Sequence, residues 1–223
     1  MVDGEFGRGG LVGCKFGRWL VWIAALLVAA ALRLHAPDWD TAVPVAGMFI
    51  AAHPDERFLL GVAQATSLWA DPCAASPDFP YGHLPVYVAR LLVMVSPTAD
   101  PLTAARLLSG LVGVLLVAVA GAWGRALAGE RGALFAAFVM AFAPFAIQQA
   151  HFYTVDPLGA VLVSMAILMA MRRRWSMAGV LVGLALACKV SLGWGVAVVV
   201  VGYGLWVAGY KLKVESRKSK VES

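Results

Sequence analysis

The chain has 223 residues, of which 61% are hydrophobic and 14% are charged, and its mean hydropathy is +0.79. Soluble domains contain roughly 45–50% apolar and about 25% charged residues, so the composition excludes a soluble globular protein and predicts an all-α polytopic membrane protein. The net charge of +5 comes from short basic runs between apolar stretches, a pattern that indicates membrane orientation rather than nucleic acid binding. The three cysteines are far apart, so they predict neither a disulfide framework nor a metal cluster.

The amino-terminal residues 1–18 are glycine-rich and basic, and an apolar run follows over residues 19–35. We expect this run to be the first membrane helix, with residues 1–18 on the cytoplasmic side. Residues 35–100 contain the one long polar segment, in which acidic residues outnumber basic ones. This acidic bias is typical of a loop on the outside of the membrane.

Interfacial helices are expected within this loop. Pro54, Asp55 and Glu56 start a helix well, because proline fits the first turn and acids there meet the positive end of the helix dipole. The run that continues to about residue 70 is expected to lie on the membrane surface. Residues 84–96 are apolar but too short to span roughly 30 Å of hydrocarbon, so we expect them to lie in the interface as well.

Five further apolar segments follow, which gives about six transmembrane helices in all. They cover residues 101–124, 132–150, 157–171, 175–188 and 190–210. With this number of spans, both termini and the basic residues Arg125, Arg131 and 172–174 all fall on the cytoplasmic side, as the positive-inside rule requires. Residues 19–210 are therefore expected to form one membrane domain, and residues 211–223 a disordered basic cytoplasmic tail.

Two polar islands interrupt the apolar sequence, one at residues 53–57 and one at residues 151–157. Each island places a carboxylate, Asp55 or Asp156, at the start of an apolar helix. Ionisable groups in such positions are costly unless they line a cavity or meet water, so they are candidates for a functional site. The six-helix scheme puts both islands on the outside face.

Lys189 is expected to join the second island. Segments 157–171 and 175–188 are shorter than the bilayer at 1.5 Å per residue. Asp156 and Lys189 should therefore sit slightly within the membrane, where the two can share one water-filled or ligand-filled cavity.

Five short motifs occur along the chain. They are His53-Pro54-Asp55-Glu56, Tyr81-Gly82-His83-Leu84-Pro85-Val86-Tyr87, Ala105-Arg106-Leu107-Leu108-Ser109, His151-Phe152-Tyr153-Thr154-Val155-Asp156-Pro157 and Ala187-Cys188-Lys189-Val190-Ser191. In these motifs, their order and their approximate spacing, the chain resembles the GT-C class of membrane glycosyltransferases. The nearest resemblance is to the lipid-carrier-dependent family of dolichyl-phosphate-mannose protein mannosyltransferases and bacterial aminoarabinose transferases. Members usually continue with several more helices, so the resemblance implies the amino-terminal half of such an enzyme, and we expect a truncated chain.

The resemblance implies transfer of a sugar from a polyprenyl-phosphate donor to a hydroxyl group of a lipid, glycan or protein acceptor at the outer face of the cell membrane. Asp55 matches the family's catalytic acid, which takes the proton of the acceptor hydroxyl in an inverting displacement and contributes about 10² to 10⁴ in rate. Glu56 and Asp156 match the other recurrent acids, which orient the acceptor or, in some members, a metal. The sequence itself supports no metal site and no other cofactor.

Cations near the outer boundary should stabilise the charge that develops on the leaving lipid phosphate. The candidates are Arg57, His83, Arg90 and Lys189. Many relatives have Glu-Lys-Pro where this chain has Gly82-His83-Leu84-Pro85. A histidine is only partly charged at neutral pH, so Lys189 or Arg90 is expected to carry more of the phosphate contact. Polar and aromatic contacts to the substrates are expected from His53, Tyr81, Tyr87, His151 and Tyr153.

Simpler interpretations of the same residues stay open. Asp55 and Asp156 suit helix starts, which does not exclude catalysis, and Lys189 could place its ammonium group at the interface without binding anything. His53 and His151 suit interfacial hydrogen bonds better than metal ligation. For the whole chain, paired acids with a lysine would also suit a membrane transporter, although no inverted repeat is evident, and a non-catalytic membrane scaffold would need neither acid.

Overall fold

The structure is a computed structural model that describes residues 9–39, 53–69, 71, 76, 80–95 and 100–222, with side chains described from residue 19 to residue 209. Its elements are α1 (Gly9–Leu34), α2 (Pro54–Ala65), α4 (Leu84–Val95), α5 (Pro101–Phe142), α6 (Pro144–Ala150), α7 (Val155–Met171), α8 (Trp175–Leu186), the 3₁₀ helix η1 (Val190–Gly193) and α9 (Trp194–Glu222). All regular elements within the described ranges are helices, which confirms the all-α fold class.

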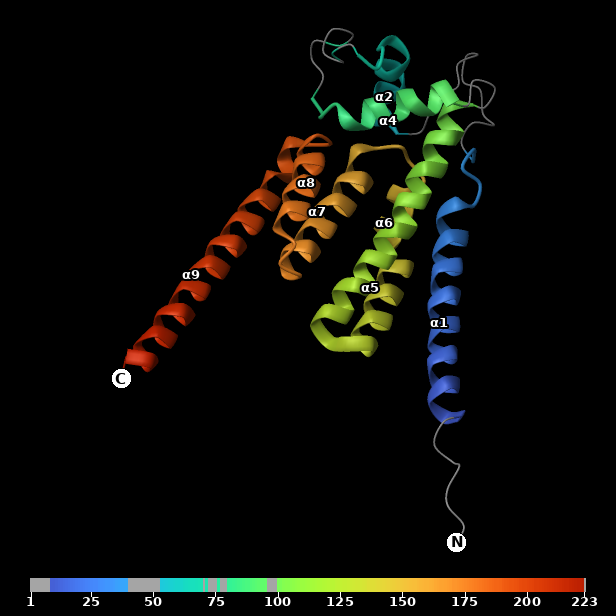
Figure 1. Cartoon of the computed structure of the whole chain (residues 1–223). Coiled ribbons are helices and arrows are strands. Elements are labelled where there is room, and N and C mark those ends of the chain that lie inside the picture. The colour runs from blue at the N-terminus through green and yellow to red at the C-terminus, as the bar shows by residue number, and fades with distance from the viewer. Residues whose placement is uncertain are drawn as a thin grey trace.

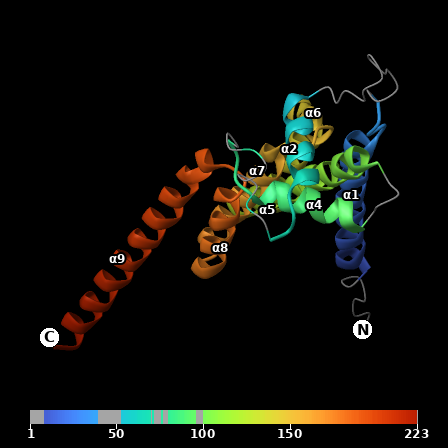
Figure 2. The same ribbon diagram turned by 90° about the horizontal axis from the view of Figure 1, so that it is seen from above.

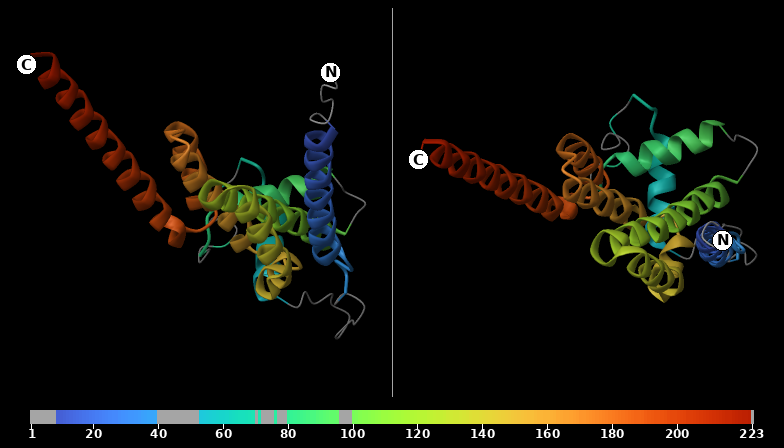
Figure 3. Two further views of the ribbon diagram at one scale, coloured as in Figure 1. Left: turned by 90° about the horizontal axis from the view of Figure 1, so that it is seen from below. Right: turned by 60° about the horizontal axis from the view of Figure 1, so that its bottom comes forward.

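The short helices α2 and α4 lie across one end of the longer helices, while the start of α1 and the end of α9 lie toward the other end (Figure 1). Seen from above, α2 crosses α4, and both contact α5 (Figure 2). Along the bundle, α1 packs against α5, and α7 packs against both α5 and α8. The far part of α9 diverges from the other helices (Figure 3).

Element α5 consists of two helical arms joined by a sharp turn. A straight helix of 42 residues would be about 63 Å long, roughly twice the thickness of a bilayer core. Ala128 and Gly129 leave the helical conformation, and Gly129 has a φ of +65°, which favours glycine. Next to the turn, a Cβ on Gly124 would lie 2.2 Å from the carbonyl oxygen of Gly132, so the arms approach at glycines. The turn falls between Arg125 and Arg131, where the sequence predicts one.

The structure shows fewer membrane spans than the six that the sequence predicts. Two segments are long and apolar enough to cross a membrane, α5 and residues 190–209, and α6 with α7 gives a third only as a broken span with a 118° bend. The expected helix over residues 132–150 is interrupted at Ala143, because Pro144 cannot continue it and starts α6 instead. Helix α8, with 12 residues, covers only about 18 Å.

Three helix boundaries differ from the predictions. α1 begins at Gly9 rather than at residue 19. α2 ends at Ala65 rather than near residue 70, because Thr66 adopts an extended conformation, and Thr66 and Ser67 are poor helix formers. α9 continues to Glu222, so the backbone of the predicted disordered tail is helical. The lysines, valines and glutamates of that tail tolerate a helix, which explains the difference.

An apolar cluster beneath α2 and α4 holds the two polar islands in place. It contains Leu59 from α2, Val86 from α4, Ala105 from α5 and Val155 from α7, all fully buried. Residues 153–157 and the start of α2 are therefore fixed against the same core, although nearly one hundred residues of sequence separate them. By contrast, many large apolar side chains along α1, α5 and α9 stay exposed, as expected of helix faces that contact lipid.

Candidate functional site

The first polar island is the start of α2, as the sequence predicts. His53 caps the helix, and its Nδ1 accepts the backbone N–H of Asp55 at 3.2 Å. Pro54 occupies the first turn, where no N–H is needed. The carboxylate of Asp55 is left partly open to solvent, with 31% of its side chain exposed, and its Oδ2 lies 4.0 Å from His53 Nδ1.

Tyr81 brings the two islands together. Its hydroxyl group donates a hydrogen bond to Asp55, and the charges of both Asp55 and Asp156 act on it. The pKa of Tyr81 is raised above its ordinary value of 10.0 by partial burial first, then by the hydrogen bond to Asp55 and the two negative charges. Asp55 at the start of α2 and Asp156 at the start of α7 therefore both lie near the hydroxyl group of Tyr81.

Two backbone hydrogen bonds fix the position of Tyr81. The N–H of Gly82 donates to the carbonyl oxygen of Cys188 at 3.0 Å, and the N–H of Leu84 donates to the carbonyl oxygen of Ala187 at 2.9 Å. Only a glycine permits this contact, because a Cβ on Gly82 would lie 2.1 Å from the oxygen of Ala187. The segment before α4 is thus bound to the segment after α8.

The same contact places Lys189 beside Asp156. Lys189 Nζ lies 2.8 Å from Asp156 Oδ1, which confirms the prediction that these two residues lie together. The two side chains are 33% and 52% exposed, respectively. Exposed ion pairs contribute only about 0–1 kcal/mol, so a ligand can exchange for either partner at little cost. We call Asp55, Tyr81, Asp156 and Lys189 the acidic cluster.

Glu56 has a different role from its neighbour. It is fully buried, and its two oxygens accept hydrogen bonds from Nε and Nη2 of Arg106, both at 2.8 Å. The backbone N–H of Tyr153 donates to Glu56 Oε1 at 2.7 Å, and Arg106 Nη1 donates to the carbonyl oxygen of Pro37 at 2.9 Å. This network joins α2 to α5 and to the second island. The expectation of a catalytic Glu56 is revised accordingly, because a carboxylate enclosed by three donors positions other residues rather than meeting a substrate.

Tyr153 also belongs to the supporting structure. Its ring is only 5% exposed, and its hydroxyl group donates to the carbonyl oxygen of Pro85 at 2.7 Å. The expected contact between Tyr153 and a substrate is therefore not available in this arrangement. Tyr87 is half-buried and packs edge-on against His83, with ring centroids 6.2 Å apart.

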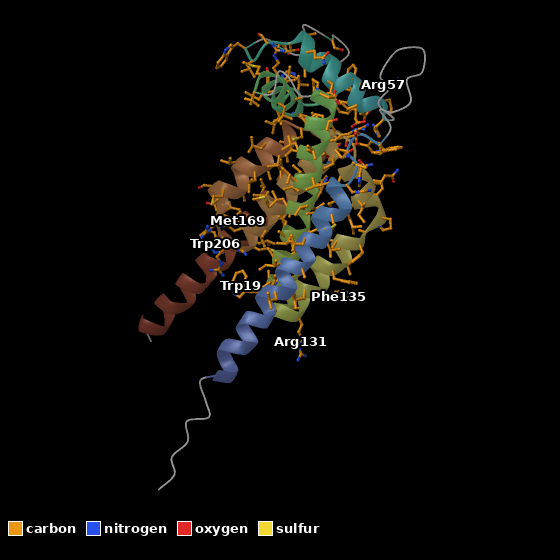
Figure 4. The ribbon with its side chains drawn as sticks, turned by 90° about the vertical axis from the view of Figure 1, so that its right-hand side faces the viewer. Trp19, Arg57, Arg131, Phe135, Met169 and Trp206 are labelled. Carbon is orange, nitrogen blue, oxygen red and sulfur yellow. The ribbon has the colours of Figure 1, made fainter. Side chains whose placement is uncertain are left out.

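The remaining cation candidates are spread over α2 and α4. His83 Nε2 lies 3.6 Å from Asp71 Oδ1. Arg57 is exposed on α2, at the end of the molecule away from Arg131 (Figure 4). Arg90 lies in the middle of α4, and its buried Nε has no hydrogen-bond partner among the described residues. Of the four predicted cations, Lys189 forms an ion pair with an acid of the cluster.

A cavity lies beside Phe152, whose ring contacts His53. It has a volume of about 420 Å³ and is lined by His35, Ala36, Trp39, Gln148, His151 and Phe152. The ring of Phe152 is tilted against His53 with centroids 5.2 Å apart, and Trp39 meets Phe152 edge-on at 6.3 Å. The predicted site residue His151 thus belongs to this aromatic cavity rather than to the acidic cluster, and His53 lies between the two.

Three residues that contribute to the site were not predicted from the sequence. Arg106 was recognised only as part of a motif, although a lone charge in an apolar helix is itself a signal of a buried partner. Phe152 and Trp39 carry no such signal, since aromatic residues are common near membrane boundaries. Within the described part of the chain, no three His, Cys, Asp or Glu side chains gather closely enough to hold a metal ion. Comparison of the chain with protein-family models, with curated proteins and with solved structures found no match.

Proposed function

We propose that the chain binds a polyprenyl-phosphate sugar at the acidic cluster and transfers the sugar, with inversion, to an acceptor hydroxyl group. The observation that carries this proposal is the convergence of Asp55, Tyr81, Asp156 and Lys189 from four separate parts of the chain. Three oxygen groups and one cation at one end of an apolar bundle suit a substrate with a polar sugar phosphate and an apolar tail.

In the proposed reaction, Asp55 is the general base. Its carboxylate takes the proton of the acceptor hydroxyl while the acceptor oxygen forms a bond to the anomeric carbon. The bond from that carbon to the phosphate oxygen breaks, and the polyprenyl phosphate leaves with the electron pair. Tyr81 suits a positioning role, because its hydrogen bond orients the carboxylate that receives the proton.

Lys189 is the proposed contact for the donor phosphate. Its ammonium group pairs with Asp156 in the exposed ion pair described above. A phosphate oxygen that replaces Asp156 on Lys189 would gain a charge-assisted hydrogen bond, and the released carboxylate could accept from a sugar hydroxyl. Charge that develops on the leaving phosphate would then meet a fixed cation.

The aromatic cavity beside His53 is the proposed acceptor side. Aromatic faces and edges with imidazole and amide groups suit a sugar or another hydroxyl-rich group, because they combine apolar contact with hydrogen bonding. His53 connects this cavity to Asp55 through its hydrogen bond at the start of α2.

We further propose that the chain crosses the cell membrane six times, with both termini in the cytoplasm. The passes would be α1, the two arms of α5 with α6 continuing the second arm, α7, α8 and α9. The exposed arginines Arg125, Arg131 and 172–174 support this orientation, because basic residues collect on the cytoplasmic side. Cysteines introduced at Arg57 and Arg131 in a cysteine-free background should be labelled from opposite sides; labelling from the same side would refute the scheme.

The test of the function is a transfer assay on membranes that contain the full chain. With a labelled polyprenyl-phosphate sugar, the wild-type chain should move label to an acceptor, and Asp55→Asn should lower the rate by about 10² to 10⁴ while donor binding persists. Asp38→Asn is the matched control, since Asp38 is an exposed acid outside the acidic cluster. Equal rates for wild type and Asp55→Asn would exclude the proposed base, and uptake of a solute without transfer would support the transporter alternative.

A further inference from the structure

A crevice lies at the end of α1 and α5 that is remote from the acidic cluster. It has a volume of about 470 Å³ and is lined by Trp19, Trp22, Leu26, Ala118, Gly121, Ala122, Arg125, Glu130 and Arg172. In Figure 4, Trp19 and Arg131 lie toward this end of the molecule, and Arg57 lies at the opposite end. The crevice therefore belongs to no part of the site described above.

The walls of the crevice are amphipathic. Leu26 on α1 and the small residues of the first arm of α5 supply an apolar surface, whereas Arg125, Glu130 and Arg172 supply charge where the arms of α5 and the end of α7 meet. Trp19 adds a large apolar surface that is 69% exposed. Tryptophan at this position is typical of the boundary between hydrocarbon and head groups.

Contacts within the crevice hold Arg125 in place. Arg125 Nη2 donates to Glu130 Oε1 at 2.8 Å, and Trp22 Nε1 donates to the same oxygen at 3.0 Å. The guanidinium group of Arg125 also lies 5.8 Å from the centre of the Trp22 ring, a cation–π distance. A guanidinium group has five N–H donors, so the bond to Glu130 leaves Arg125 able to bind an anion. Its rigid position reduces the entropic cost of doing so.

Arg172 provides a second cation from a different element. It caps the carboxyl end of α7, and its side chain is exposed and makes no hydrogen bond or ion pair with any residue that the structure describes. Two arginines against one glutamate leave the crevice with a net positive charge, which favours an anionic ligand over a zwitterionic one. Arg131 and residues 173–174 are exposed at the same end and add to the positive field.

We propose that this crevice binds an anionic phospholipid of the adjacent leaflet. The phosphate would lie between Arg125 and Arg172, since guanidinium groups match phosphate oxygens in geometry and charge. One acyl chain would lie along Leu26 and the small residues of α5. Basic pockets between membrane helices are suited to such lipids, because anionic head groups are concentrated on the cytoplasmic leaflet.

The experiment measures lipid retention by the purified full-length chain, by native mass spectrometry after exchange with mixed phosphatidylglycerol and phosphatidylcholine. The wild type should retain phosphatidylglycerol preferentially. The double variant Arg125→Gln/Arg172→Gln should lose about tenfold or more in affinity, the order expected for two phosphate contacts at a membrane surface. Arg131→Gln removes one charge at the same end from a residue that does not line the crevice, so it should weaken retention less than Arg172→Gln does.

Two further variants keep the test independent of folding. Arg172→Gln alone leaves the contacts of Trp22, Glu130 and Arg125 intact and should already weaken retention. Ala118→Leu places a larger side chain in the apolar part of the crevice, where the acyl chain would lie, and should weaken retention without a change of charge. The proposal is overturned when the double variant retains phosphatidylglycerol as Arg131→Gln does, or when the wild type shows no preference between the two lipids. Neither result depends on sugar transfer.

Discussion

Substitution of Glu56 by glutamine should destabilise the chain severely. The side chain keeps its shape but loses its charge, and Arg106 is left as a buried cation whose two hydrogen bonds to Glu56 lose their charged acceptor. Removal of one partner from a buried ion pair costs about 3–5 kcal/mol, because the remaining charge is desolvated without compensation. The exposed pair of Asp156 and Lys189 gives the contrast, since Asp156→Asn should cost less than about 1 kcal/mol.

The assay is reversible unfolding of the purified chain in detergent micelles with Glu56→Gln, Arg106→Gln and the double variant. The two residues are in contact, so the double variant should be more stable than the sum of the single effects predicts, by about 1–3 kcal/mol. Additive single effects, or a Glu56→Gln effect as small as that of Asp156→Asn, would refute the structural role of the buried pair. The same result would return Glu56 to the group of candidate catalytic acids.

Three other outcomes are expected. Gly82→Ala should destabilise the chain by about 1–3 kcal/mol in the same unfolding assay, because the new Cβ would break two backbone hydrogen bonds. Gly61→Ala is the control: a Cβ at Gly61 would have no neighbour within 4 Å, so this variant should be neutral or stabilising. Tyr81 should ionise above pH 10.0 in an ultraviolet titration and closer to 10.0 in Asp55→Asn; its contribution to stability is present below that pH and is lost as the pH rises through its raised pKa. Tyr153→Phe should cost about 0.5–1.5 kcal/mol, because the buried hydrogen bond from the hydroxyl group to the Pro85 carbonyl is lost; a neutral effect would contradict a structural role for this bond.

The starts of α2 and α5 were predictable from the sequence because local chemistry determines them. Pro54 followed by two acids favours the first turn of a helix, and α2 begins at Pro54. The proximity of Asp156 and Lys189 was predicted from the short segments on either side, although their direct ion pair was not. These inferences required only the periodicity of a helix and the cost of charge in hydrocarbon.

The different environments of Asp55, which is partly exposed, and Glu56, which is buried, were not predictable from the sequence. Adjacent residues in a helix point about 100° apart, so one faces the core when the other faces outward. Which of them faces inward depends on Arg106, fifty residues away in the sequence, and no local pattern specifies that partner. The interruption at Pro144 did carry a local signal, since a proline inside an apolar run ends a helix before it.

The proposed reaction is a single displacement at the anomeric carbon with Asp55 as the base, and the anomeric configuration of the product is its most direct test. Purified full-length chain would be incubated with a polyprenyl-phosphate sugar of known configuration and a hydroxyl acceptor, and the product analysed by nuclear magnetic resonance. We predict a glycoside of inverted configuration with release of one polyprenyl phosphate per sugar transferred. A product of retained configuration would contradict the inverting mechanism, and a rate of product formation that is unchanged in Asp55→Asn would contradict the role of Asp55 as the base.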